Sequence, residues 1–165
     1  MVSEQILADS VDAMVPVDSD GLVLPDMSAT QALSAVGDFI EEFTAACINM
    51  IQNCGTVNID WNDIRSTIVN ARCVHVKSVI GSVEQPDELV EKAFFAKPGQ
   101  LSNGEHFQKA VYVISSGPDV SAQTINELGS KIQAKLAQDA RIIFGLEDKN
   151  FSANEIGLTL VAGAN

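Results

Sequence analysis

The chain has 165 residues, of which 46% are hydrophobic, and carries a formal net charge of -12 at neutral pH. This length and composition predict one folded domain with a hydrophobic core, while the acidic charge argues against nucleic acid or an anionic membrane as a partner. Three cysteines without a Cys-x-x-Cys spacing predict neither a disulfide framework nor a zinc site. With no leader at Met1 and no long apolar run, we expect a cytoplasmic protein without direct membrane contact.

Two elements are predicted at the start of the chain. The short apolar stretch at 9–17 predicts a buried strand. Apolar residues then recur at three- and four-residue steps over 28–53, which predicts an amphipathic helix roughly 39 Å long. Ser28 with Gln31 is typical of a capping box at its start, and Gly55 predicts a left-handed stop after its end.

The segment GTVNIDWNDIRSTI, at 55–68, opens a second and shorter helix and carries the candidate functional residues Asn58, Asp60 and Asp63. Asp60 is a good N-cap, and Asp63 falls at the third helical position, where a carboxylate favours the unpaired amides. An ordinary helix start therefore explains both acids. Alternatively, the two carboxylates project from the helix start beside Asn58 and act on a water or cation held by another molecule, as phosphoryl transfer requires.

The rest of the chain alternates strands with helices. We predict strands at 72–80, 110–116, 140–145 and 156–163, helices at 86–96 and 121–138, and a loop at 97–106. This order predicts an α/β fold in which a mostly parallel or mixed sheet of about four strands, with packed helices, follows the long helix.

The order of a long helix, a glycine turn and Asn-x-Asp-x-x-Asp resembles the synergy loop of the tubulin/FtsZ family. VNIDWNDIRSTI looks like the FtsZ version of that loop, and the stretch at 110–165 is similar to the FtsZ C-terminal stretch of strand, glycine turn, helix and two strands. Upstream, VDAMVPVDSDGL looks like the last strand of the family's GTP-binding domain. The resemblance covers roughly residues 10 to 164.

The resemblance implies a domain organisation and a shared active site. It implies a tubulin/FtsZ C-terminal-type domain at 56–165, a central helix at 28–55, and at 1–27 the terminal strand and linker of a missing GTP-binding domain. In the family, the synergy loop of one subunit completes the hydrolytic site on GTP bound by the next.

For this chain, the resemblance implies that Asp60 and Asp63 are the polarising carboxylates and that Asn58 is a nucleotide-facing or loop-fixing group. It also implies a homopolymer, or a tubulin/FtsZ-type GTP-binding domain, as the partner. GTP would be bound by that partner, with Mg as the candidate accompanying ion.

The sequence also departs from the family. Because no glycine-rich phosphate loop is present, the chain is not expected to bind GTP tightly or to hydrolyse it alone. Two alternatives stay open: a non-catalytic filament-binding or regulatory module of the same fold, and an unrelated small α/β ligand-binding domain. We expect Trp61 to pack against the long helix, and Cys47 and His75 to be core residues.

Overall fold

The computed structural model describes residues 11, 26–52, 55–71, 73–95 and 107–164. Within these ranges the elements are α3 (Ala29–Gln52), α4 (Trp61–Ile68), β1 (Cys73–Ser82), α5 (Pro86–Phe94), β2 (Lys109–Ser116), α6 (Ala122–Ala134), β3 (Arg141–Asp148) and β4 (Glu155–Ala164). The strand expected at 9–17, apart from Val11, and the loop expected at 97–106 lie outside the described residues.

The four strands form one mixed sheet in the order β1-β4-β2-β3. Strand β4 pairs antiparallel with both β1 and β2, and β2 pairs parallel with β3. Three strands therefore run in one direction, and β4, the last in the chain, is inserted between β1 and β2. The predicted α/β fold with a mixed sheet of about four strands is confirmed.

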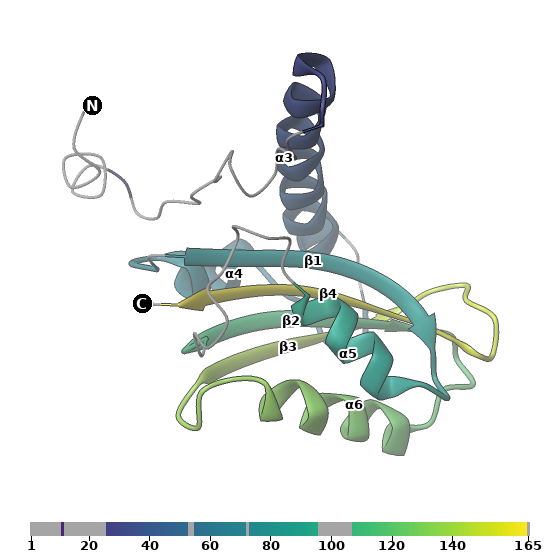
Figure 1. The fold of residues 1–165 in the computed structure, drawn as a ribbon. Coiled ribbons are helices and arrows are strands. Elements are labelled where there is room, and N and C mark those ends of the chain that lie inside the picture. The colour runs from purple at the N-terminus through teal and green to yellow at the C-terminus, as the bar shows by residue number, and fades with distance from the viewer. Residues whose placement is uncertain (1–10, 12–25, 53–54, 72, 96–106, 165) are drawn as a thin grey trace.

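Helices cover both faces of the sheet (Figure 1). Helices α5 and α6 pack on one face, where Leu128 is completely buried, and α3 and α4 pack on the other, where Ile64 is completely buried. Because successive strand side chains point to opposite faces, β2 supplies both cores. Tyr112 faces α5 and α6, whereas Val111 and Val113 face α3 and α4.

Helix α3 begins with the predicted capping box. The Gln31 backbone N–H donates to Ser28 Oγ at 3.3 Å, and the Ser28 N–H donates to Gln31 Oε1 at 2.8 Å. Its C-terminal half buries Met50 against the sheet, but Leu33 and Ile40 in its N-terminal half are 76% and 55% exposed. Only part of the apolar stripe predicted for this helix is therefore buried in the described structure.

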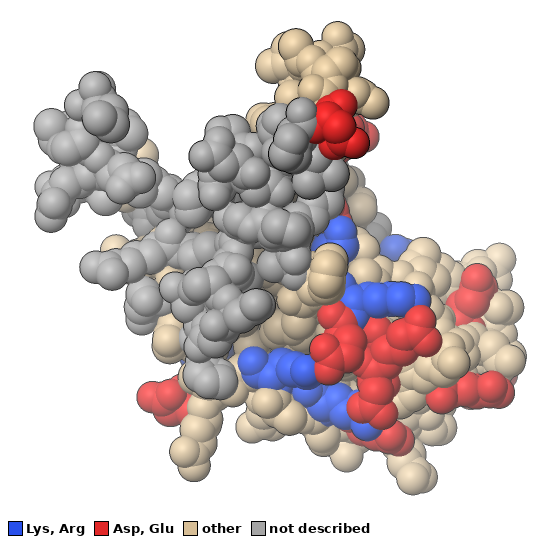
Figure 2. All heavy atoms as spheres, viewed as in Figure 1, with Lys and Arg blue, Asp and Glu red and all other residues tan. Residues whose placement is uncertain are grey.

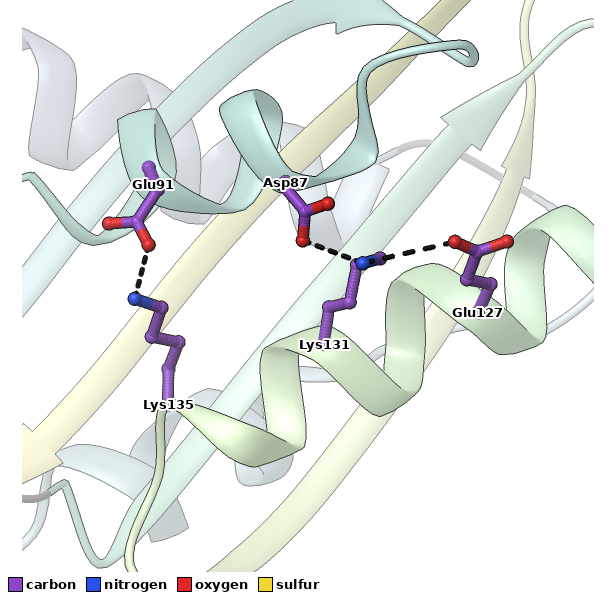
Figure 3. A network of polar contacts seen from close by, with 5 residues as sticks. All are labelled: Asp87, Glu91, Glu127, Lys131 and Lys135. Atoms are coloured by element: carbon purple, nitrogen blue, oxygen red, sulfur yellow. Dashed lines mark hydrogen bonds and ion pairs between the residues drawn. The ribbon is translucent and has the colours of Figure 1, made fainter.

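Ion pairs join α5 to α6 on the outer face. Lys131 Nζ lies 2.6 Å from Asp87 Oδ1 and 3.8 Å from Glu127 Oε1, and Lys135 pairs with Glu91 (Figure 3). Figure 2 shows acidic and basic side chains interleaved over this face. Because these pairs are largely exposed to solvent, they contribute little to the stability of the fold.

The buried His75 fastens β1 to the end of α5. Its Nε2 lies 2.7 Å from the Ala93 carbonyl oxygen, and its ring centroid lies 5.8 Å from that of Phe107. Burial lowers the pKa of His75 below the ordinary 6.5, and the positive charge of Lys77 adds to this, while the Ala93 carbonyl and Glu42 oppose it. The neutral imidazole therefore donates its Nε2–H to Ala93, and His75 is a core histidine, as predicted.

We expect the free energy of unfolding to fall as the pH drops below the ordinary His pKa of about 6.5. In that window the unfolded chain binds the imidazole proton and the folded chain does not, so the loss is up to about 1.4 kcal/mol per pH unit. Above this window His75 adds no pH dependence. The test is denaturant unfolding of wild type and His75→Gln, which keeps an N–H donor, from about pH 7.5 to 5. Parallel profiles would contradict the expectation.

Candidate functional site

The candidate site is the loop at 55–60 together with the first turn of α4. The loop lies on the outer edge of β3, where Val57 forms an isolated antiparallel bridge with Leu146. The Val57 N–H donates to the Leu146 carbonyl at 3.3 Å, and the Leu146 N–H donates to the Val57 carbonyl at 2.9 Å. Thr56 Oγ1 adds a longer hydrogen bond of 3.4 Å to Asp148 Oδ2. The sheet therefore fixes the position of the loop.

Two glycines permit this close approach. A Cβ atom at Gly55 would lie 1.9 Å from the Leu146 carbonyl oxygen, so no side chain fits there. A Cβ atom at Gly145 would lie 2.8 Å from Ile59 Cγ1 and 3.0 Å from the Val57 carbonyl oxygen. The left-handed stop predicted at Gly55 is wrong, since its φ is not in the left-handed region. Glycine is needed at this position because two backbone segments meet.

The residues after the bridge alternate between exposed and buried positions. Asn58 is exposed, and its Oδ1 accepts the Gly55 N–H at 2.8 Å. Ile59 is only 4% exposed and belongs to the core between α3, α4 and the sheet. Asp60 is exposed again. The described contacts of Asn58 thus fix the loop, and its predicted nucleotide-facing role stays a prediction.

Asp60 and Asp63 form a reciprocal capping box at the start of α4. Asp60 Oδ1 accepts the Asp63 N–H at 3.0 Å, and Asp63 Oδ2 accepts the Asp60 N–H at 3.0 Å. The geometry of an ordinary helix start is therefore present. Each carboxylate uses one oxygen in the box, which leaves its second oxygen without a hydrogen bond to any other described residue. Capping and a contact with another molecule are thus compatible.

Helix α4 is firmly seated on β4. Ile64 is completely buried, and the buried Thr67 donates from Oγ1 to the Asp63 carbonyl at 3.0 Å. A Cβ atom at Gly163 would lie 2.6 Å from the Thr67 carbonyl oxygen, so helix and strand are in direct backbone contact. Packing against β4 therefore holds the start of α4, with Asp60 and Asp63, in place.

Trp61 lies beside α3, as predicted, but does not pack fully. It borders an apolar groove together with Cys47 and Ile51 of α3, and 52% of its surface remains exposed. Burial raises the pKa of the Cys47 thiol, which disfavours the reactive thiolate. Cys47 is therefore a core residue, as predicted, and Trp61 is half-exposed.

The candidate site by itself provides only some of the groups that bind a nucleotide or a metal ion. No group of three or more His, Cys, Asp or Glu side chains in the described ranges could hold a metal ion. In nucleotide sites, Mg²⁺ is held by one or two carboxylates together with phosphate oxygens, so Asp60 and Asp63 fit the protein's share of such a site. A larger hollow beside α6, of about 610 Å³, is lined by uncharged residues and offers no cation for a phosphate.

Known sequences resemble this chain over most of its length. The chain is 23% identical over 164 residues to the cell division protein FtsZ of Pseudomonas putida, which covers 96% of this chain and 41% of that protein. It is 22% identical over 144 residues to FtsZ 1 of Thermococcus kodakarensis, which covers 86% and 38%. The chain is therefore similar in sequence to FtsZ over nearly its whole length.

Solved structures show the same fold. An FtsZ dimer from M. jannaschii matches 97% of this chain and 47% of that chain, with a TM-score of 0.71 and 18% identity. CetZ2 of Haloferax volcanii, solved as a GTPγS-bound protofilament, matches 98% and 49%, with a TM-score of 0.69 and 13% identity. The predicted tubulin/FtsZ C-terminal-type fold is thereby confirmed. No protein-family model matches the chain.

The matched region is only a part of each relative. The FtsZ-like chain spans about two fifths of the length of the FtsZ proteins of P. putida and T. kodakarensis. Among the helices within the described ranges, none has the length and apolar character needed to cross a membrane. These matches therefore do not assign the activity or the partners of a whole FtsZ to this chain.

Sequence reasoning missed the residues that hold the loop. Leu146 and Gly145 are about ninety positions from the residues they contact, so no local pattern connects them to 55–60. The available signal was Gly145 itself, because glycine inside a strand often marks a close backbone approach. No role was predicted for that glycine.

Gly145→Ala should displace the loop. The added methyl group would collide with Ile59 and Val57, and such overpacking typically lowers the free energy of unfolding by about 1–3 kcal/mol. Gly37→Ala is the matched control, because a Cβ atom there meets nothing within 4 Å in helix α3. It should raise stability by roughly 0.5–1 kcal/mol. Denaturant unfolding should therefore give opposite signs, and a neutral Gly145→Ala would contradict the close packing of loop and strand.

The cap is tested by Asp60→Ala and Asp60→Asn. Asp60→Ala removes the acceptor for the Asp63 N–H and should lower stability by about 1 kcal/mol. Asp60→Asn keeps an acceptor oxygen and should change stability much less. Urea unfolding followed by Trp61 fluorescence measures both changes, and equal losses in the two variants would show that the carboxylate does not act as a cap.

Proposed function

We propose that this chain supplies the C-terminal half of an FtsZ-type GTPase interface, in which Asp60 and Asp63 act in trans on GTP bound by an adjacent subunit. The observation that carries the proposal is the capping box. It holds both carboxylates in place at the start of α4, and it uses only one oxygen of each carboxylate. The second oxygens are therefore available to a partner without loss of the cap.

The chemistry that suits this arrangement is hydrolysis of the γ-phosphate. The attacking water forms a bond to phosphorus while the bond to the leaving oxygen breaks, and positioning of the water supplies much of the rate. The free carboxylate oxygens would accept hydrogen bonds from that water and hold it in line. Asn58 would keep the loop closed through Gly55. A cation such as Mg²⁺ on the phosphates would offset repulsion between carboxylates and nucleotide.

The same proposal accounts for the exposed part of α3. Leu33 and Ile40 are largely exposed on the N-terminal half of this helix, and large exposed apolar side chains often mark interaction surfaces. We assign 28–55 to a central helix that packs between 56–165 and a GTP-binding domain. A GTPγS-bound protofilament of CetZ2 supports a homopolymer as the natural setting, because that protein has the same fold.

A non-catalytic filament-binding or regulatory module of the same fold is the second candidate. It is favoured by one observation, namely that capping alone gives both aspartates a structural role. In that case the chain would bind an FtsZ-type domain and leave its hydrolysis rate unchanged. The two candidates therefore differ in whether the charges of Asp60 and Asp63 change the rate of GTP hydrolysis by that domain.

The decisive variant is Asp60→Asn combined with Asp63→Asn. Each capping bond uses one side-chain oxygen as acceptor, and asparagine retains such an oxygen, so the fold should survive while two charges are lost. With the separately made GTP-binding domain of P. putida FtsZ, wild type should stimulate phosphate release, and the double variant should lose about 10²-fold of that stimulation.

The control is Asp119→Asn combined with Asp139→Asn, which removes the same charge from two exposed turn residues outside the loop. It should stimulate like wild type. If all three proteins bind and stimulate equally, the catalytic proposal fails. If all three bind and none stimulates, the filament-binding module is the better account.

A further inference from the structure

Strand β3 forms one edge of the described sheet and pairs with β2 on its inner side (Figure 1). Successive residues of a strand direct their backbone N–H and C=O groups to opposite neighbours. Leu146 directs both of its groups outward, to Val57. Ile142 and Phe144, four and two residues earlier, therefore direct theirs outward as well. Within the described ranges, no backbone hydrogen bond uses these groups of Ile142 or Phe144.

The odd-numbered residues of this segment confirm that alternation. The Arg141 N–H donates to the Gln108 carbonyl at 2.9 Å, and the Lys149 N–H donates to the Ser116 carbonyl at 2.9 Å. Both bonds point toward β2 and not toward the outer edge. A stretch of free strand edge therefore extends over 141–145, next to the place where Val57 pairs with β3.

A hollow of about 610 Å³ lies beside this free edge, between β3 and α6. Ile142, Phe144 and Leu146 line it from β3. Tyr112 is stacked on Phe144, with ring centroids 6.2 Å apart, and Phe144 is 48% exposed. A Cβ atom at Gly129 of α6 would lie 3.2 Å from the Tyr112 hydroxyl oxygen, so the missing side chain leaves space there. The free edge thus adjoins an apolar hollow.

Edge and hollow together are suited to an extended strand. A strand laid along β3 would pair with the outward backbone groups, and every second side chain would enter the hollow. A small molecule in the hollow would leave the backbone groups of Ile142 and Phe144 without partners. A second copy of the chain is disfavoured, because each copy carries a net charge of -12 and the two would repel each other.

The charges around the edge indicate the chemistry of the partner. Asp139 and Asp148 are exposed at the two ends of the free stretch, and Arg141 is an exposed base between them. Lys149 is already paired with Glu147 at 3.2 Å. With the overall charge of -12, these carboxylates favour a basic partner.

We propose that the free edge of β3 binds an extended peptide segment of another protein, with apolar side chains at alternate positions and basic residues at its ends. The segment runs antiparallel to β3, because Val57 already pairs with the same edge in that direction. Its apolar side chains lie opposite Ile142 and Phe144 and fill the hollow. The inference is independent of the proposed function, since neither Asp60 nor Asp63 nor a nucleotide takes part.

The probe is an acetylated and amidated synthetic peptide, Lys-Val-Thr-Phe-Thr-Val-Lys, whose binding to the whole chain is measured by calorimetry. In the antiparallel register its Val and Phe residues bond to the edge. A methyl group on the Phe amide nitrogen should therefore weaken binding by about 10-fold or more. A methyl group on one Thr amide, which faces away, is the matched control and should leave binding unchanged. Equal binding of the two methylated peptides, or no saturable binding of the unmodified one, would overturn the inference.

Amide hydrogen exchange followed by NMR locates the bound peptide. At saturation, the N–H groups of Ile142 and Phe144 should exchange at least about 10-fold more slowly, because each gains an acceptor. The Ile143 N–H, which faces β2, should change much less. Binding without protection of Ile142 and Phe144 would place the peptide elsewhere and overturn the inference.

Two substitutions at one position separate backbone pairing from side-chain contact. Phe144→Thr and Phe144→Pro both remove the ring, but only proline also removes the outward N–H, a change that an edge strand tolerates. Phe144→Pro should therefore bind the peptide about 10-fold more weakly than Phe144→Thr. Ile40→Thr, at a 55% exposed position on α3, is the control and should bind like wild type. Equal affinities of the two Phe144 variants would contradict the proposal.

Two measurements without peptide complete the test. Circular dichroism identifies any variant that fails to fold, and if Phe144→Pro does not fold, the two methylated peptides provide the same comparison on the wild-type chain. Light scattering reports the oligomeric state. A dimeric wild type with a monomeric Phe144→Pro variant would show that a second copy covers the edge, and the peptide proposal would be overturned.

Discussion

The candidate site depends on one tertiary contact, the antiparallel pair between Val57 and Leu146 at the edge of β3. This pair anchors the loop that leads into α4, and glycines at 55 and 145 allow the two backbones to approach. Ile59 then enters the core and turns the next residue outward. Helix α4 also packs against β4, so the loop contact and this packing together set its direction relative to the sheet. The edge strand thereby gains a partner at one end, which also limits unwanted strand pairing.

The capping box shows how one pair of side chains can have both a structural and a functional role. A carboxylate has two oxygens, and a helix cap uses one of them. Asp60 and Asp63 bind each other's backbone N–H groups, and each uses one carboxylate oxygen to do so. Their side chains are therefore held in place before any partner arrives, which reduces the conformational entropy that binding would otherwise cost.

Local features of this chain could be predicted from its sequence, whereas contacts between distant segments could not. The caps at Ser28 and Asp60 follow from short patterns and are present in the structure. The position of β4 between β1 and β2 follows from packing of the whole chain. The same applies to Gly55, for which the predicted conformation was wrong because its constraint lies in Leu146. Trp61 was placed beside α3, but its exposure depends on surface geometry that periodicity does not encode.

The central claim is that a prebuilt helix start presents its free carboxylate oxygens to a nucleotide on another subunit. The most direct measurement is a structure of this chain bound to an FtsZ-type GTP-binding domain with a non-hydrolysable GTP analogue. The claim predicts that Asp60 or Asp63 lies within hydrogen-bond reach, about 2.6–3.2 Å, of the water in line with the γ-phosphate. The capping bonds between them should be intact. A complex in which both side chains face solvent, with the nucleotide at a different surface, would contradict it.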